Sequence, residues 1–204
     1  MCFSASASFV AGGALSVLGV AALVHSKAKK NVLLASIPLL FGIQQLIDGL
    51  VWLSFSLPVL HTVAVFAYVF FAQVFWPIFI PIAVLLSEQN NARKMLLRML
   101  AFVGASVGIF FSYYLLYGNV TAQIVNHCVA YDTHHAYRFT VLAFYIIAVC
   151  GAFFVSSQRF LRIFGFLVLA SFFISGWLYL ETFSSTWCFF AAILSALLYK
   201  YVTK

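Results

Sequence analysis

The chain consists of long apolar runs separated by short polar interruptions. Each run holds roughly 20 mostly apolar residues, the length that a helix needs to cross the hydrocarbon core of a bilayer. Lipid leaves only helices or closed barrels as spanning structures, and the runs lack the strict alternation of barrel strands. The pattern therefore predicts an all-α polytopic membrane protein, a single domain over residues 1–204 with seven transmembrane helices. The expected spans are 5–24, 32–55, 62–86, 95–117, 139–155, 160–180 and 185–202.

The basic residues test this arrangement independently of the apolar pattern. With seven spans, ten of the eleven Lys and Arg residues fall on one side of the bilayer, and only Arg138 falls on the other. Positively charged residues favour the cytoplasmic side of a membrane. We therefore expect the N-terminus outside and the C-terminus in the cytoplasm.

Composition narrows the class of protein further. Hydrophobic residues make up 65% of the chain and charged residues only 7%, with a mean hydropathy of +1.10. A soluble domain carries about 25% charged residues, so a soluble cytosolic enzyme is excluded. The net charge of +7 comes from short clusters between the apolar runs. These clusters are typical of topology signals rather than of a nucleic-acid surface, and the expected partner is the lipid bilayer.

Small residues recur at every fourth position on three of the expected spans. Such stripes allow helix backbones to approach closely, which replaces the hydrophobic drive that is missing between helices in lipid. Packing within the chain and a homodimer seam are both open, and so is a place in a larger membrane complex, because the chain has little extramembrane mass. The stripes are Ser4, Ser8, Gly12 and Ser16; Gly104, Gly108 and Ser112; and Cys188, Ala192 and Ala196.

The leading candidate site surrounds an acidic residue inside the second expected span. Asp48 lies roughly 10 Å below the outer end of that span at 1.5 Å per residue. Intramembrane ionisable residues are costly and are functional candidates for that reason. Two amides and a tryptophan share its helix face, and an amide on the third span could face it. The predicted pocket comprises Gln44, Gln45, Asp48, Trp52 and Gln73, with an interhelical hydrogen-bond clamp as the structural alternative.

A second candidate site lies in the outer loop 118–138. As a short interfacial helix, this loop would place His127, Tyr131, His134 and His135 on one face. Imidazole with a carboxylate such as Glu181 suits zinc or copper. The spacing matches no strong metal motif, and solvated loop histidines are the alternative reading.

Three cysteines and one acid are the remaining candidate functional residues. Cys2, Cys128 and Cys188 all fall on the outer side, where one disulfide among them is expected and three pairings are open. Glu88 falls on the cytoplasmic side beside Arg93, and there we expect a solvated loop.

Three stretches resemble a known family: the opening Met1-Cys2-Phe3-Ser4-Ala5, the run from Gln45 to Gly49 followed by Val51-Trp52, and the run from Phe183 to Cys188. Together they are similar to an uncharacterised bacterial family of short multi-span membrane proteins, a domain of unknown function. The resemblance covers essentially the whole chain. It implies a bacterial inner-membrane protein and no particular activity.

Two functions follow as hypotheses. The first is a small transporter, channel or sensor that binds a small solute, cation or proton in an outward-facing pocket at Asp48. The alternative is a membrane-embedded, metal-dependent hydrolase or redox enzyme at the extracytoplasmic face. In that enzyme His127, His134 and His135, with Asp48 or Glu181, would hold the zinc or copper ion that activates water.

Overall fold

The computed structural model describes residues 4–133 and 137–203, and nearly all of them are helical. Each of the expected apolar runs is helical, so the all-α prediction is confirmed apart from one short hairpin. The helices are α1 (Ala5–Val24), η1 (Lys29–Asn31), α2 (Val32–Ser54), α3 (Pro58–Val69), η2 (Phe70–Phe75), α4 (Trp76–Ser87), α5 (Asn91–Tyr117), α6 (Arg138–Val155), α7 (Arg159–Leu178), α8 (Phe183–Ser195) and α9 (Leu197–Val202), and the strands are β1 (Val120–Val125) and β2 (Cys128–Thr133).

Six helical stretches of the described chain are long and apolar enough to cross a membrane, with α3, η2 and α4 forming one of them and α8 and α9 another. The remaining apolar helix, over Phe139–Val155, is shorter. The outward faces of these helices carry large apolar side chains, such as Phe102, which is 75% exposed. Such a surface is compatible with a multi-pass membrane protein, because lipid does not penalise exposed apolar side chains.

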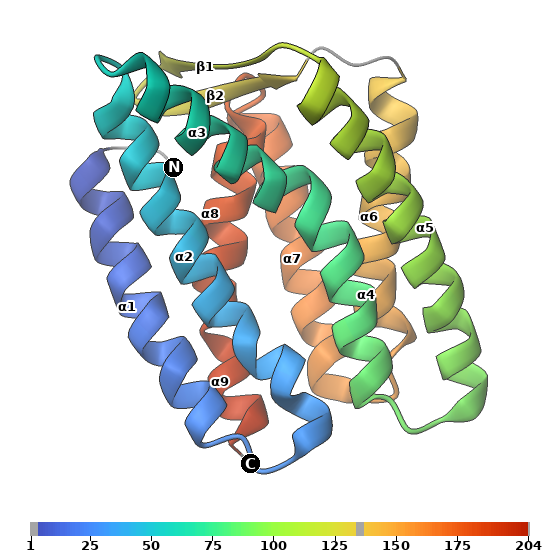
Figure 1. Cartoon of the computed structure of the whole chain (residues 1–204). Coiled ribbons are helices and arrows are strands. Elements are labelled where there is room, and N and C mark those ends of the chain that lie inside the picture. The colour runs from blue at the N-terminus through green and yellow to red at the C-terminus, as the bar shows by residue number, and fades with distance from the viewer. Residues whose placement is uncertain (1–3, 134–136, 204) are drawn as a thin grey trace.

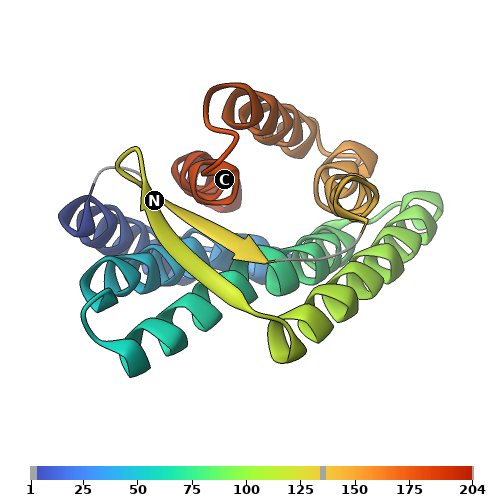
Figure 2. The same ribbon diagram turned by 90° about the horizontal axis from the view of Figure 1, so that it is seen from above.

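The helices are arranged around a common interior. Seen along the bundle, α1 to α5 form one row, and α6, α7 and α8 form an arc that closes against it (Figure 2). Helix α8 packs on α2 and on α7, while α6 packs on both α4 and α5. The β1–β2 hairpin lies across one end of the bundle, opposite the C-terminus (Figure 1). We refer to that end as the hairpin end.

The loop that the sequence analysis treated as a short interfacial helix is this hairpin. The strands pair antiparallel from Val120 with Thr133 to Val125 with Cys128. Asn126 and His127 form the two-residue turn, with positive φ angles of 49° and 58°. Paired positive φ angles define the turn that matches the right-handed twist of a hairpin. The helical prediction was wrong because two segments rich in β-branched and aromatic residues flank the turn residues Asn126 and His127, and this pattern outweighs a single four-residue spacing.

The third apolar run contains a π-helical segment, η2, which ends just before Trp76 and Pro77. Pro77 has no N–H, and its ring disfavours a regular helix over the preceding turn. The Trp76 N–H bonds Phe71 O, five residues back, instead of Ala72 O. The freed Ala72 carbonyl accepts a hydrogen bond of 2.7 Å from the Tyr145 hydroxyl on α6. The irregularity therefore becomes a specific junction between the third run and α6.

The small-residue stripes on α1 and α5 are covered by neighbouring helices of the same chain. A Cβ at Gly12 would meet Leu46 and the Gly42 carbonyl on α2. A Cβ at Gly104 would overlap the Pro77 carbonyl on α4. Both glycines thus serve close packing within the chain, which is the first of the alternatives that the spacing left open.

Glu88 lies at the opposite end of the bundle and is buried, with 2% of its surface exposed. The expectation of a solvated loop there was wrong. Its carboxylate accepts hydrogen bonds from the backbone N–H of Asn90 (3.0 Å) and from both the N–H and the hydroxyl of Ser157 (2.6 and 2.7 Å). These bonds tie the α4–α5 loop to the α6–α7 loop, which local sequence cannot reveal.

Candidate functional site

Asp48 is fully buried on α2 and is held from two other elements. Its Oδ2 accepts a hydrogen bond of 2.9 Å from the Ser8 hydroxyl on α1. Its Oδ1 accepts one of 2.8 Å from the Tyr131 hydroxyl on β2. A carboxyl group in an apolar interior is costly unless its oxygens are hydrogen-bonded. The hairpin therefore supplies one donor to this buried acid, and α1 supplies another.

Tyr131, whose hydroxyl donates to Asp48, lies on β2 at the hairpin end of the bundle. Its ring stacks on the ring of Tyr68 from α3, with centroids 4.1 Å apart. Burial, and next the neighbouring Asp48 carboxyl group, raise the pKa of Tyr131 well above its ordinary value. The hydroxyl consequently stays protonated at neutral pH and remains a donor to Asp48.

The two amides that precede Asp48 on α2 are buried with it. Gln44 Oε1 accepts a hydrogen bond of 2.7 Å from the indole N–H of Trp76 on α4. Its Nε2, the Gln45 Oε1, the Tyr68 hydroxyl and the Ser185 hydroxyl have no hydrogen-bond partner among the described residues. Buried polar atoms without partners are rare and point to a bound molecule or water.

Cys188 on α8 connects these groups. Its thiol lies beside the Gln44 amide and the Tyr68 hydroxyl, and it is also near Asp48. Ser185, one turn earlier on α8, lies beside Tyr68. We call the set formed by Gln44, Asp48, Tyr68, Ser185 and Cys188 the polar cluster.

The other two residues of the predicted pocket have different surroundings. Gln73, in η2, donates a hydrogen bond of 3.0 Å to the Thr133 hydroxyl on β2. Tyr131 and Thr133 alternate with Asp132 and so face the same side of β2, about 7 Å apart. The hairpin therefore bridges Asp48 and Gln73, which the sequence analysis grouped directly. Trp52 is half-buried, one turn beyond Asp48 on α2.

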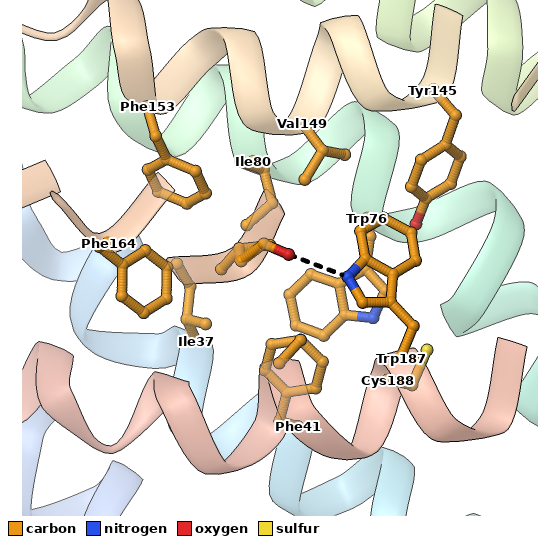
Figure 3. Close-up of a pocket in the computed structure, with 12 residues that line it drawn as sticks. Ile37, Phe41, Trp76, Ile80, Tyr145, Val149, Phe153, Phe164, Trp187 and Cys188 are labelled. Atoms are coloured by element: carbon orange, nitrogen blue, oxygen red, sulfur yellow. Dashed lines mark hydrogen bonds between the residues drawn. The ribbon is translucent and has the colours of Figure 1, made fainter. Parts of the chain in front are cut away.

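A small cavity of about 40 Å³ adjoins the polar cluster. Side chains from α2, α4, α6, α7 and α8 line it, and Figure 3 shows how the aromatic rings converge on it. Cys188 and Trp76 belong both to this lining and to the surroundings of Gln44. The lining residues are Ile37, Phe41, Trp76, Ile80, Tyr145, Val149, Phe153, Phe164, Val168, Trp187, Cys188 and Ala191.

The proposed metal ligands do not meet in the described part of the chain. His127 is exposed at the tip of the hairpin turn, and Glu181 is exposed between α7 and α8. His134 and His135 lie outside the described residues. Over residues 4–133 and 137–203, no group of three or more His, Cys, Asp or Glu side chains could hold a metal ion.

The cysteines divide into bonded and free. Cys128 is disulfide-bonded, whereas Cys188 and Cys150 are free and buried. Cys2 lies outside the described residues. Of the three cysteines expected to share one disulfide, Cys128 forms one, whereas Cys188 does not and lies free in the polar cluster.

Sequence reasoning missed several contributors to the site, among them Ser185 and Cys188 on α8. Ser8 appeared only as a member of a small-residue stripe, and Tyr68 and Tyr131 were not assigned to the acid. Ser8 could have been found from its position, because a polar residue on an apolar span often hydrogen-bonds to a neighbouring helix in lipid. No local signal identifies the two tyrosines, because their position depends on how the hairpin folds over the bundle.

The architecture is that of a bundle of long apolar helices, compatible with a multi-pass membrane protein, with one buried acid near its hairpin end. The chain belongs to a family of unknown function (DUF6629), whose model matches residues 1–204. This membership confirms the part of the resemblance that concerned an uncharacterised family covering the whole chain. No curated protein and no solved structure matches the chain.

Proposed function

We propose that this chain is a small integral membrane protein that binds a small solute, cation or proton in a polar pocket at Asp48, as a transporter, channel or sensor. One observation carries the proposal: a fully buried carboxyl group on an apolar helix, surrounded by buried polar atoms that lack partners among the described residues. An interhelical clamp would be expected to satisfy its own polar groups. Buried donors and acceptors without partners beside an acid favour a binding site for a small solute, cation or proton.

The roles of the pocket residues follow from their positions. Asp48 supplies the proton-binding or cation-binding carboxyl group, and the Ser8 and Tyr131 hydroxyls orient it. Gln44 and Gln45 supply further hydrogen-bonding groups on the same helix, and Trp52 supplies an aromatic wall toward the hairpin end. Gln73 acts through the hairpin, by holding Thr133.

The proposed topology has seven spans, with the hairpin end outside and the basic end in the cytoplasm of a bacterial cell. Nine of the ten basic residues expected inside lie in the described chain, on η1, α5, α7 and α9 and in the loop before η1. All nine lie at the end of the bundle opposite the hairpin, which we call the basic end. Trp177, which is 89% exposed, and Tyr117 lie near the hairpin end, as aromatic residues at a membrane interface do. The pocket at Asp48 would then open outward.

This topology can be tested by labelling single cysteines in intact cells. We expect Asn119→Cys, between α5 and β1, to react with a membrane-impermeant maleimide, and Lys29→Cys to react only after permeabilisation. Both variants are made in a background in which Cys150 and Cys188 are replaced by Ala. The reverse pattern would contradict the orientation, and labelling of both sites from outside would contradict the span count.

The function is tested with protons, which need no knowledge of a physiological solute. Purified protein is reconstituted into liposomes that contain a pH-sensitive dye, and proton flux is recorded under an imposed membrane potential. In parallel, the intrinsic fluorescence of the protein is titrated with pH and with Na⁺, K⁺ and NH₄⁺. We expect Asp48→Asn to abolish the flux or the fluorescence response.

The matched control is Asp132→Asn, which removes an exposed acid on the hairpin. It is expected to behave as the unmodified protein does. If Asp48→Asn matches the unmodified protein in both measurements, the Asp48 carboxyl group is structural and the proposal is wrong.

A further inference from the structure

The Ser8 hydroxyl on α1 has one hydrogen and two acceptors within reach. Its oxygen lies 2.9 Å from Asp48 Oδ2 and 3.3 Å from the backbone carbonyl of Ser4, the N-cap residue of α1. Ser8 and Asp48 are both fully buried. A hydroxyl group donates one hydrogen bond and accepts through two lone pairs. The hydrogen can therefore point at the acid or at the carbonyl, but not at both at once.

The Ser4 carbonyl is able to take this second bond. It already accepts the backbone N–H of Ser8 at 3.2 Å. A carbonyl oxygen has two lone pairs, so the hydroxyl can occupy the other one. Turning the Ser8 hydroxyl from Asp48 to Ser4 therefore leaves its hydrogen with an acceptor in either position.

This freedom gives Asp48 two hydrogen-bonded states. As a carboxylate, it accepts from Ser8 at Oδ2 and from Tyr131 at Oδ1. When Oδ2 takes up a proton from water at the hairpin end, a new O–H bond would form there, and the Ser8 hydrogen would turn to Ser4 O. The Asp48 O–H would then donate to Ser8 Oγ, with the Tyr131 bond unchanged. Both states keep the acid hydrogen-bonded, which is the condition for holding a polar group in an apolar interior at low cost.

The ionisable groups that lie near Asp48 on the surrounding elements leave both states accessible. They are Tyr131 on β2, Tyr68 on α3 and Cys188 on α8, all of which are uncharged when protonated. The partner on α1 is Ser8, whose hydroxyl is uncharged. None of these four groups is a permanent cation, which would favour the ionised acid.

We propose that the occupant of the Asp48 pocket is a proton, and that Ser8 is the positioning residue whose hydroxyl changes acceptor as the proton binds and leaves. This inference rests on the proposed function and selects one of its three occupants. A cation needs several oxygen ligands around it, but the hydrogens of Ser8 and Tyr131 point at the Asp48 oxygens. A solute needs room, and neither Ser8 nor Asp48 has exposed surface. A proton needs only an acceptor whose hydrogen bonds can rearrange.

Infrared spectroscopy of the full chain, purified in mild detergent, follows this proton directly. The C=O stretch of a protonated carboxyl group is separate from the bands of carboxylates. We expect one component of this band to grow as the pH is lowered and to shrink when the pH is raised again. That component should be absent from Asp48→Asn and present in Asp132→Asn, which removes an exposed acid on the hairpin.

Ser8→Ala tests the exchanging hydroxyl. The carboxylate loses a charge-assisted hydrogen bond, which is stronger than the bond lost by the neutral acid, so proton release and flux in liposomes should slow by roughly tenfold. The neutral acid loses the acceptor of its O–H, so the C=O band of Asp48 should move to higher frequency. Ser8→Thr keeps a hydroxyl at this position and should restore both properties.

The matched control is Ser16→Ala, which removes a serine two turns further along the same stripe of α1. It should leave the flux and the band of Asp48 unchanged. If Ser8→Ala does not fold, Ser8→Cys takes its place, because a thiol is a weaker donor and acceptor than a hydroxyl.

Three outcomes overturn the inference. The first is an Asp48 band that is present, or absent, at every pH at which the protein stays folded. The second is a saturable, Asp48-dependent fluorescence response to Na⁺ or K⁺ at constant pH, which makes the occupant a cation. The third is a Ser8→Ala protein that keeps the band frequency or, where flux is present, the flux of the unmodified protein.

These outcomes are distinct from failure of the proposed function. A cation response that needs Asp48 overturns the proton and leaves the pocket standing. A Ser8→Ala protein that behaves as the unmodified one removes the role of Ser8 and leaves Asp48 as the binding group. The proposed function itself fails only where Asp48→Asn changes neither the flux nor the fluorescence response.

Discussion

At the scale of single residues, the environment of Asp48 decides what the acid can do. Its oxygens accept hydrogen bonds from Ser8 and Tyr131, which lie 40 and 83 residues away in the chain. In an apolar interior, a carboxyl oxygen without a hydrogen bond is costly, so the loss of either hydroxyl should destabilise the fold. The acid and its donors therefore have to be considered as one unit.

Removing one donor to Asp48 tests how strongly this unit stabilises the fold. We expect Tyr131→Phe to lower the free energy of unfolding by about 1–3 kcal/mol, because the buried carboxyl group loses a partner. The measurement is thermal unfolding in mild detergent. Tyr117→Phe removes the hydroxyl of an exposed tyrosine and is the control. Equal stability of the two variants would show that the Tyr131–Asp48 bond contributes nothing.

At the scale of elements, close approach between helices replaces the hydrophobic effect. The α5 stripe packs against α4 and η2, and the α1 stripe packs against α2. The π-helical segment between α3 and α4 belongs to the same packing, because it exposes a carbonyl that α6 can bond. The helices thus meet through backbone atoms as much as through side chains.

Two glycines in the middle of helices allow the effect of helix packing on stability to be separated from the effect of helix propensity. In Gly104→Ala the added methyl group would overlap the Pro77 carbonyl, so we expect a loss of about 1–3 kcal/mol or more. In Gly13→Ala the methyl group would meet nothing within 4 Å. That variant should be neutral or gain up to about 1 kcal/mol from helix propensity. Melting temperatures of the two purified variants decide the matter, and a reversed order would refute the packing role of Gly104.

At the scale of the whole molecule, one acid joins two loops at the basic end. Burial acts to raise the pKa of Glu88, but the hydrogen bonds from Asn90, Ser157 and Gln89 outweigh it and lower the pKa from 4.5 to about 2. A lowered folded-state pKa means that the stabilisation is present above pH 4.5. It is lost as the pH falls from 4.5 toward 2.

This linkage predicts acid-sensitive stability that depends on Glu88. The lowering of the pKa from 4.5 to about 2 corresponds to roughly 3 kcal/mol. We expect Glu88→Gln to be less stable than the unmodified protein at pH 7 and to lose less stability between pH 5 and pH 3. Unfolding is measured across this range, with Glu181→Gln, at an exposed position, as the control. A parallel pH dependence in Glu88→Gln would contradict the assignment.

The local pattern of apolar and polar residues predicted most of the helices. It predicted neither the hairpin nor the hydrogen bonds between distant segments. The limits of α1, α2 and α6 were predicted within a few residues, because each apolar run has the length expected of a spanning helix and each interruption is polar. The turn at Asn126 and His127 was missed because the histidine spacing was weighed above the β-branched and aromatic residues on either side of the turn. The environment of Glu88 was predicted wrongly because Ser157, which donates two of its hydrogen bonds, lies 69 residues away in the chain.

The amino-acid sequence alone determines that this chain is a bundle of apolar helices with its basic residues gathered in clusters, since hydropathy and charge are properties of each segment. It also singles out Asp48, because an acid in an apolar run is conspicuous. Only the tertiary structure places the Tyr131 hydroxyl on that acid, brings Cys188 beside Gln44 and opens an aromatic cavity below them. These features arise where segments far apart in the chain meet, and no local pattern encodes such a meeting.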